Sequence, residues 1–202
     1  MPFITLEGIE GSGKSTLAPR LTRALGPDTL LTQEPGGTEL GRAIRSLLLD
    51  PRNGAMAAST ELLLYFADRA QHVEEQLKPA LAAGRTVLCD RYVDSSLAYQ
   101  GYGRGLSIDD IRAIAEVATG GLVPDLTVLL DIEVVAGLRR VGRRGPQDRL
   151  ESEDVAFHER VRAGYHEMAR QDPGRWRVVD AAGSHDEVFA RVLDVVSRGV
   201  GP

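Results

Sequence analysis

The stretch Gly8-Ile9-Glu10-Gly11-Ser12-Gly13-Lys14-Ser15 decides the fold, because it matches in full the phosphate-loop pattern G-x-x-x-x-G-K-[ST]. Glycines at this spacing let successive backbone amides point inward, and the helix that follows turns its positive N-terminal end toward the same anion. The loop follows an apolar run, Phe3 to Leu6, and opens an amphipathic stretch at Lys14. This order predicts an α/β protein that binds a phosphorylated ligand.

The chemistry of such a loop assigns roles to individual residues. Lys14 is expected to reach the β- and γ-phosphates of a nucleotide, and the Ser15 hydroxyl to ligate Mg²⁺. The predicted ATP-binding residues are Gly8, Ile9, Glu10, Gly11, Ser12, Gly13, Lys14, Ser15 and Thr16. The loop alone indicates a nucleotide and not a reaction. A GTPase is disfavoured, because the only lysines are Lys14 and Lys78 and no Asn-Lys-x-Asp base-reading segment exists.

Composition narrows the class of protein further. A length of 202 residues, a 43% hydrophobic share and a 26% charged share are typical of one globular domain, here residues 1–202. A net charge of −5 argues against a nucleic-acid polymer as partner, since such binding requires many neutralised phosphates. The lone cysteine, Cys89, favours a reducing compartment, so we expect a cytoplasmic location. No signal peptide is visible, and no window nears the ~20 apolar residues that span a membrane.

Short apolar runs alternate with longer amphipathic stretches, which predicts strand–helix units around a parallel sheet. The expected fold is a three-layer α/β fold around the P-loop, with a central five-stranded parallel sheet flanked by helices. The predicted strands are Phe3–Leu6, Thr29–Thr32, Thr86–Cys89, Leu126–Leu130 and Arg177–Val179. The predicted helices are Lys14–Leu25, Glu39–Leu49, Thr60–Ala83, Ile108–Ala118, Val134–Val141, Val155–Ala169 and Glu187–Ser197. Pro19 is expected to bend or shorten the first of these helices.

Asp90 and Arg91 follow the predicted strand Thr86–Cys89 directly. They therefore belong to the carboxyl edge of the sheet, where open α/β sheets bind ligands. Asp90 could hold Mg²⁺ through water, and the planar fork of Arg91 could clamp a phosphate. The alternative from these two residues alone is a surface charge pair without function.

The run from Asp90 to Gly101, DRYVDSSLAYQG, resembles the signature segment of thymidylate kinases. Thr32 to Thr38, TQEPGGT, is similar to that family's T-R-E-P-G-G-T motif, and Leu63 to Arg69, LLYFADR, to its thymidine-binding helix. With the phosphate loop at one end and Asp180 to Gly183 at the other, the resemblance covers essentially the whole chain in order. It implies a homodimeric nucleoside-monophosphate kinase that transfers the γ-phosphoryl group of ATP to dTMP with Mg²⁺, giving dTDP and ADP.

The resemblance also implies contacts to the base and sugar of the acceptor. Tyr65, where the family usually has Phe, would stack on thymine, while Arg69 and Ser96 would contact the base. Tyr99 would lie under the sugar and disfavour a 2′-hydroxyl, and Glu10 would accept a hydrogen bond from the 3′-hydroxyl. By helical pattern alone, Tyr65 is more often a core residue.

Two arginines, Arg45 and Arg91, would hold the acceptor phosphate. The implied substrate-binding set is Glu10, Glu34, Arg45, Tyr65, Arg69, Arg91, Ser95, Ser96, Tyr99 and Gln100. At Gln33 the chain departs from the family's arginine, so no phosphate role is expected there. Asp180 to Gly183 would lie beneath the adenine.

The stretch from Arg139 to Arg149 holds five arginines around a Gly/Pro-containing loop and resembles the family's lid, about residues 139–151. Family members without an arginine in the phosphate loop carry a catalytic arginine in the lid, and position 11 is Gly, which places this chain in the lid-arginine, bacterial-like type. The predicted catalytic residues are Arg149, Arg144, Arg143, Lys14, Asp90 and Arg91, and the metal ligands are Ser15 and Asp90. Against the lid prediction stands a bias: two of the 24 basic residues are lysines, so 22 are arginines.

Two alternative functions remain at this point. One is a kinase of the same class that uses another deoxynucleotide or a nucleoside as acceptor. The other is a P-loop binding module in which ATP only switches a partner surface. The four histidines, His72, His158, His166 and His185, have no metal-like spacing, and we expect them to be structural.

Overall fold

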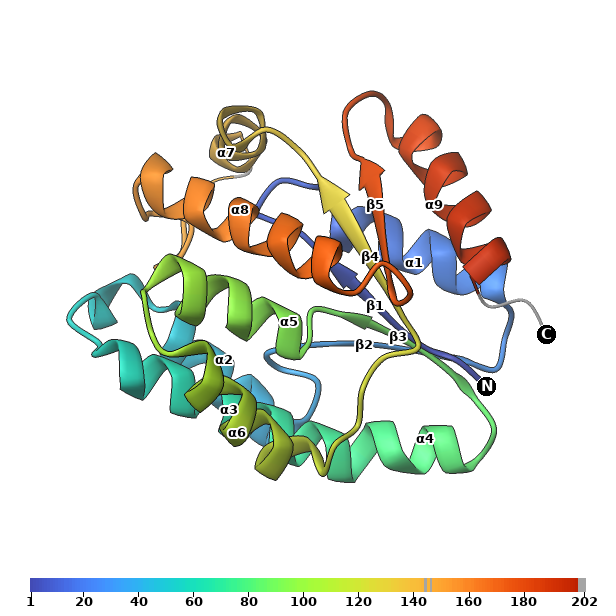
Figure 1. Cartoon of the computed structure of the whole chain (residues 1–202), viewed down its shortest axis with the longest axis horizontal. Helices are drawn as coiled ribbons and strands as arrows, with labels where there is room; N and C mark the ends of the chain where they lie inside the picture. The colour runs from blue at the N-terminus through green and yellow to red at the C-terminus, as the bar shows by residue number, and fades with distance from the viewer. Residues whose placement is uncertain (144, 146, 200–202) are drawn as a thin grey trace.

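The computed structural model describes residues 1–143, 145 and 147–199. Its sheet contains β1 (Phe3–Glu7), β2 (Thr29–Gln33), β3 (Thr86–Asp90), β4 (Leu126–Asp131) and β5 (Trp176–Asp180). The strands are parallel and follow the order β2-β3-β1-β4-β5 (Figure 1). The predicted five-stranded parallel sheet is confirmed, and each predicted strand is one residue short at its carboxyl end.

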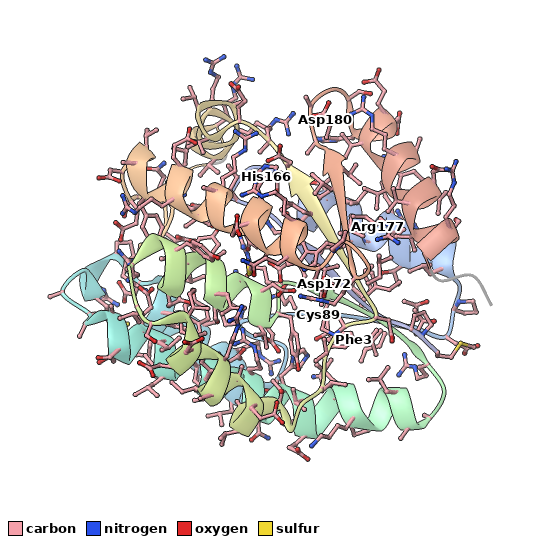
Figure 2. The ribbon with its side chains drawn as sticks, viewed as in Figure 1. Phe3, Cys89, His166, Asp172, Arg177 and Asp180 are labelled. Carbon is pink, nitrogen blue, oxygen red and sulfur yellow. The ribbon has the colours of Figure 1, made fainter. Side chains whose placement is uncertain are left out.

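The burial of each strand follows from its place in the sheet. All five residues of β1, the central strand, are buried, whereas the edge strands expose Leu31 on β2 and Val178 on β5. Phe3 on β1 and the free Cys89 on β3 lie in the interior (Figure 2). Helices that cover both faces account for the continuous apolar pattern of the central strands.

Helices form a layer on each side of the sheet (Figure 1). On one face, α1 (Lys14–Leu25) and α9 (His185–Gly199) pack side by side. On the other lie α8 (Val155–Gln171), α4 (Lys78–Ala82) and the π-helical turn Leu97–Gly103, with α3 (Ala58–His72), α6 (Ile108–Thr119) and α2 (Glu39–Leu49) farther out. The short helices α5 (Val93–Ser96) and α7 (Val134–Gly142) flank the carboxyl edge. None of the helices in the described ranges is long and apolar enough to cross a bilayer.

Most predicted helices are confirmed to within two residues at each end, including the one that contains Pro19. That helix runs on to Leu25, so the expectation that Pro19 shortens it is wrong. Ser107 caps α6, because its hydroxyl accepts a hydrogen bond from the backbone N–H of Asp110 at 3.2 Å.

The single helix predicted over Thr60–Ala83 is wrong in one respect. The chain widens into a π-helical turn, Val73–Leu77, between α3 and α4, and the backbone N–H of Lys78 bonds to the carbonyl of Val73. Pro79 explains the turn, since a proline lacks an N–H and its ring clashes with the carbonyl four residues earlier in a regular helix.

The helical segment Val93–Gly103 was not predicted from the sequence, because its glycines and tyrosines have low helix propensity. Close packing on α8 favours it. A Cβ at Gly103 would lie 2.7 Å from the ring of Phe157, and one at Gly164 would lie 2.5 Å from Tyr102. Tertiary contact therefore overrides local propensity in the segment that carries the signature.

Candidate active site

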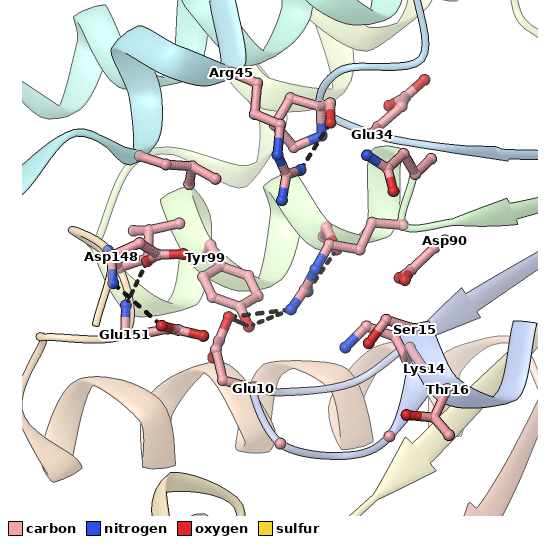
Figure 3. Close-up of a pocket in the computed structure, with 18 of the residues that line it drawn as sticks. Glu10, Lys14, Ser15, Thr16, Glu34, Arg45, Asp90, Tyr99, Asp148 and Glu151 are labelled. Atoms are coloured by element: carbon pink, nitrogen blue, oxygen red, sulfur yellow. Dashed lines mark hydrogen bonds and ion pairs between the residues drawn. The ribbon is translucent and has the colours of Figure 1, made fainter. Parts of the chain in front are cut away.

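A cleft of about 680 Å³ opens at the carboxyl edge of the sheet, where the phosphate loop, the loop after β2, α3 and the Val93–Gly103 segment meet (Figure 3). It brings together most of the predicted site. The predicted residues that line it are Glu10, Gly11, Gly13, Lys14, Ser15, Thr16, Glu34, Arg45, Tyr65, Arg69, Asp90, Arg91, Ser95, Ser96, Tyr99 and Gln100.

The phosphate loop is in backbone contact with α7, the helix that leads into the predicted lid. Gly11 has a φ of 72°, and a Cβ there would lie 2.1 Å from the carbonyl oxygen of Gly137. The approach is mutual, because a Cβ at Gly137 would lie 2.5 Å from the carbonyl oxygen of Glu10. Only glycine at both positions allows the loop and helix to touch in this way.

Lys14 is buried at the base of the cleft. Its Nζ donates to the carbonyl oxygens of Gly8 at 2.8 Å and Ile9 at 3.2 Å, and to the hydroxyl of Ser12 at 3.2 Å. Gly8, Ile9 and Ser12 are therefore partners of Lys14 and do not themselves line the cleft. Burial lowers the pKa of Lys14 to about 8, and the nearby charge of Arg91 lowers it as well.

Arg91 links the two halves of the cleft. Its Nη2 donates to Glu10 Oε1 at 3.0 Å and to the hydroxyl of Tyr99 at 3.1 Å, and Tyr99 donates to the same carboxylate at 2.5 Å (Figure 3). Its backbone has a φ of 73°, a left-handed conformation that is uncommon for a residue with a side chain. A cation, a carboxylate and a phenol thus converge beside the phosphate loop.

The carboxylate of Glu10 is ionised at any ordinary pH. Burial alone would raise its pKa, but His158, Arg91 and Lys14 lower it to about 2. Nδ1 of His158 lies 3.2 Å from Glu10 Oε2 yet lacks hydrogen-bond geometry, so the interaction is one of proximity. No motif or residue spacing connects His158, on α8, with the phosphate loop.

A second buried carboxylate, Glu7, supports Arg91 from behind. Glu7 accepts the backbone N–H of Tyr92 at 2.8 Å and the hydroxyls of Ser95 at 2.6 Å and Tyr165 at 2.8 Å. Arg91 Nη1 in turn donates to Ser95 Oγ at 3.1 Å. Burial and the charge of Asp94 raise the pKa of Glu7 to about 7. Sequence reasoning missed Glu7 and Tyr165, which do not line the cleft.

The far wall carries the residues expected to meet a base. Tyr65 and Arg69 project from α3, and Arg69 Nη1 donates to Ser96 Oγ at 3.0 Å. Glu34 pairs with Nε of Arg69 at 2.6 Å. Arg45 reaches the cleft from α2 and donates to the carbonyl of Pro35 at 2.8 Å.

The lid arginines differ in position. Arg149 is buried: its Nε donates to the carbonyl of Leu48 at 2.7 Å, and its Nη1 pairs with Glu61 at 2.5 Å. It does not line the cleft. Arg143 is exposed at the end of α7, and Arg144 lies outside the described residues.

Arg140 does line the cleft, although we did not select it from the sequence. Its guanidinium donates to the carbonyl oxygens of Gly11 at 3.2 Å and Ala181 at 3.3 Å. Helical spacing could have revealed it, because Arg140 lies three residues after Gly137 and so shares the face of α7 that meets the loop. The segment after β5, a strand that ends at Asp180 (Figure 2), adds Gly183, Ser184 and His185 to the lining.

Comparison with known proteins agrees with this geometry, since the thymidylate kinase family model matches residues 6–192. The chain belongs to the thymidylate kinase family. It is 52% identical to a thymidylate kinase of Desulfovibrio desulfuricans, over 96% of this chain and 94% of that protein. The thymidylate kinase of Deinococcus radiodurans is also 52% identical, over 97% and 96% of the two chains.

A solved structure agrees with the fold. The crystal structure of thymidylate kinase from Ehrlichia chaffeensis matches with a TM-score of 0.81 and 31% identity, covering 96% of this chain and 98% of that one. The chain is therefore a nucleoside-monophosphate kinase that phosphorylates dTMP with ATP as donor.

Proposed function

We propose that this thymidylate kinase aligns ATP and dTMP end to end in the 680 Å³ cleft, in the presence of Mg²⁺, through the residues assigned below. An oxygen of the dTMP phosphate attacks the γ-phosphorus of ATP. The bond from that phosphorus to the bridging oxygen of ADP breaks, and ADP and dTDP leave. No covalent enzyme intermediate is required, because positioning and charge neutralisation supply the catalysis. The contact of Arg91 with Glu10 and Tyr99, where the two halves of the cleft join, carries the proposal.

The donor half consists of Gly8 to Thr16. The loop amides and the N-terminus of α1 receive the phosphates, and Lys14 exchanges its carbonyl partners for phosphate oxygens. A pKa near 8 leaves most Lys14 amines charged at neutral pH, and an incoming anion favours the charged form further.

The residues present fit a magnesium ion. Oδ1 of Asp90 is buried at the cleft and has no hydrogen-bond partner within the described part of the chain, and Ser15 also borders the cleft. A carboxylate and a hydroxyl oxygen are the ligands that Mg²⁺ accepts beside phosphate oxygens and water. When bound, the ion would neutralise charge on the β- and γ-phosphates.

The acceptor half takes dTMP against the opposite wall. Tyr65 stacks on thymine, Arg69 and Ser96 meet the edge of the base, and Tyr99 lies under the sugar. Arg91 and Arg45 hold the acceptor phosphate. Glu34, Ser95 and Gln100 complete the wall, and Glu10 accepts from the 3′-hydroxyl, as its low pKa allows.

The chain forms one domain, and residues 139–151 act as a lid over its cleft. Arg149, Arg144 and Arg143 are the candidates for neutralising the charge of the phosphoryl group during transfer. Arg149 must leave Glu61 to take that role, because their ion pair holds it away from the cleft. The exposed Arg143 faces no such restriction.

A cytoplasmic homodimer completes the proposal. Leu40 and Leu47 on α2 and Leu63 on α3 are each more than half exposed, and α2 packs against α3. Leu40 and Leu47 are seven residues apart and share a helix face, so they offer an apolar surface to a second copy.

A coupled ATP assay across dTMP, dUMP, dCMP, AMP and GMP tests the acceptor, and faster turnover of any other acceptor than of dTMP would overturn it. Arg91→Lys tests the site. Because lysine cannot bridge Glu10 and Tyr99 with a planar fork, we expect kcat/KM for dTMP to fall by about 100-fold, with KM for ATP within about threefold. Arg112→Lys, on the exposed face of α6, is the matched control and should behave as wild type.

A further inference from the structure

His72, the last residue of α3, is an imidazole completely enclosed by protein. Its Nδ1 lies 2.8 Å from Glu34 Oε1, and its Nε2 lies 2.6 Å from the hydroxyl of Thr32 on β2. Because a carboxylate can only accept, Nδ1 carries a proton and donates it to Glu34. The ring does not line the cleft, so His72 cannot touch a nucleotide there.

The carboxylate of Glu34 accepts hydrogen bonds from two side chains. Oε1 accepts from Nδ1 of His72, and Oε2 accepts from Nε of Arg69 at 2.6 Å. The side chains of Glu34 and Arg69 are each 1% exposed, so water does not replace a lost partner readily. Without the imidazole, Oε1 would be a buried acceptor with no donor, and the carboxylate could turn away from Arg69.

Arg69 transmits this constraint to the cleft wall. Its Nη1 donates to Ser96 Oγ and its Nη2 to the carbonyl of Tyr92, both at 3.0 Å. Arg69 and Ser96 line the cleft where the base of dTMP is expected. The contacts form one continuous path from Thr32 through His72, Glu34 and Arg69 to the base-binding wall.

The ring is also fixed by its shape. A Cβ at Gly37 would lie 2.6 Å from Cδ2 of His72, so the loop after β2 packs directly on the imidazole. The same loop places Pro35 in the cleft lining and is tied by Gln76, whose Nε2 donates to the carbonyl of Gly37 at 2.5 Å. His72 therefore joins α3, β2 and this loop behind the acceptor half only.

We propose that His72 is a positioning residue for the acceptor nucleotide, which acts through Glu34 to hold Arg69 and Ser96 in the geometry that binds the base. The inference rests on the proposed function, because it assigns the base to this wall. We expect no effect of His72 on ATP binding in the donor half, since the path of contacts from His72 ends at the base-binding wall.

Two substitutions separate the two ring nitrogens. The amide nitrogen of asparagine can take the place of Nδ1, and that of glutamine the place of Nε2. His72→Gln removes the donor to Glu34, and we expect KM for dTMP to rise roughly tenfold while KM for ATP stays within twofold. His72→Asn restores the donor and should keep KM for dTMP within about threefold of wild type. His166→Gln, on α8 outside the cleft, is the control and should change neither KM.

The His72→Gln/Glu34→Gln double variant tests the path itself. If His72 acts through Glu34, KM for dTMP in the double variant should be no higher than in the worse single variant, and additive increases would overturn the proposal. Equal losses in His72→Asn and His72→Gln, or parallel increases in both KM values, would also overturn it. All variants are assayed below their unfolding midpoints. A wild type that does not turn over dTMP would instead defeat the proposed function.

Discussion

Glu61 offers the sharpest test of how Arg149, at the end of the predicted lid segment, is held in the fold. Its buried carboxylate accepts hydrogen bonds from Gln100 at 2.8 Å and from Arg104 at 3.1 Å. It also forms an ion pair with Arg149 at 2.5 Å. Arg104 is 20% exposed and can be rehydrated, but Arg149 is only 5% exposed. Glu61→Gln keeps the shape of the side chain, removes its charge, and leaves the buried Arg149 without the counter-ion it has among the described residues.

Removing one partner of a buried ion pair costs about 3–5 kcal/mol, and the hydrogen-bonding amide of glutamine favours the lower end, about 3 kcal/mol. For a chain of this length, 1 kcal/mol shifts the unfolding midpoint by roughly 2–4 °C, so we expect a decrease of roughly 6–12 °C. Thermal and urea unfolding, at one fixed protein concentration, measure both quantities. Glu153→Gln is the control, because Glu153 is 28% exposed in its pair with Arg104 and should cost less than about 1 kcal/mol.

The loss should also depend on pH with a definite sign. Burial alone would raise the pKa of Glu61, but its hydrogen bonds from Arg104 and Gln100 and the charge of Arg149 lower it below its ordinary value of 4.5. The stabilisation is therefore complete above pH 4.5 and disappears as the pH falls through the lower pKa of the folded state. A decrease below 1 kcal/mol at pH 7, or a difference from wild type that grows on acidification, would refute this account of Glu61 and Arg149.

Two further predictions follow from the loop and its support. Gly137→Ala puts a methyl group 2.5 Å from the carbonyl oxygen of Glu10, so α7 must move. We expect the unfolding free energy to fall by about 1–3 kcal/mol and KM for ATP to rise. Gly142→Ala is the control, because Gly142 has open space around it and its substitution should change neither quantity. Equal behaviour of the two variants would contradict the contact. Because the folded state raises the pKa of Glu7 to about 7, Glu7 lowers the stability of the wild type as pH rises from 4.5 to 7, by up to about 3 kcal/mol. Urea unfolding of Glu7→Gln should lack this decline, and parallel pH profiles for the two proteins would count against it.

The fold and the phosphate-loop side of the cleft could be predicted because their signals are local, whereas the acceptor-side residues were implied only by the family resemblance. The phosphate loop needs its glycines, Lys14 and Ser15 at fixed spacing, and each strand end brings the next residues to one edge. Glu7 and His72 could not be found in this way. Their roles depend on partners from other elements, Tyr165 for one and Glu34 for the other, which no period or motif connects.

The lid shows the opposite limit. Five arginines in eleven residues indicate phosphate chemistry, but sequence alone does not say which side chain meets the cleft. Packing determines which arginine does so. The ion pair with Glu61 keeps Arg149 buried, while the contact of Gly137 with the phosphate loop places Arg140 at the cleft. That contact depends on Gly11 in the phosphate loop and Gly137 in α7, and no sequence motif relates these two glycines to each other.

The left-handed backbone of Arg91 has a consequence for attempts to stabilise the protein. An L-residue in that conformation costs roughly 1–2 kcal/mol that glycine would not incur, yet glycine has no guanidinium to bridge Glu10 and Tyr99. Because the Arg91 guanidinium also pairs with Glu10 and donates to Ser95 and Tyr99, glycine at position 91 would remove the backbone strain only by removing the cation that these partners share, and a screen for heat resistance alone would keep the arginine.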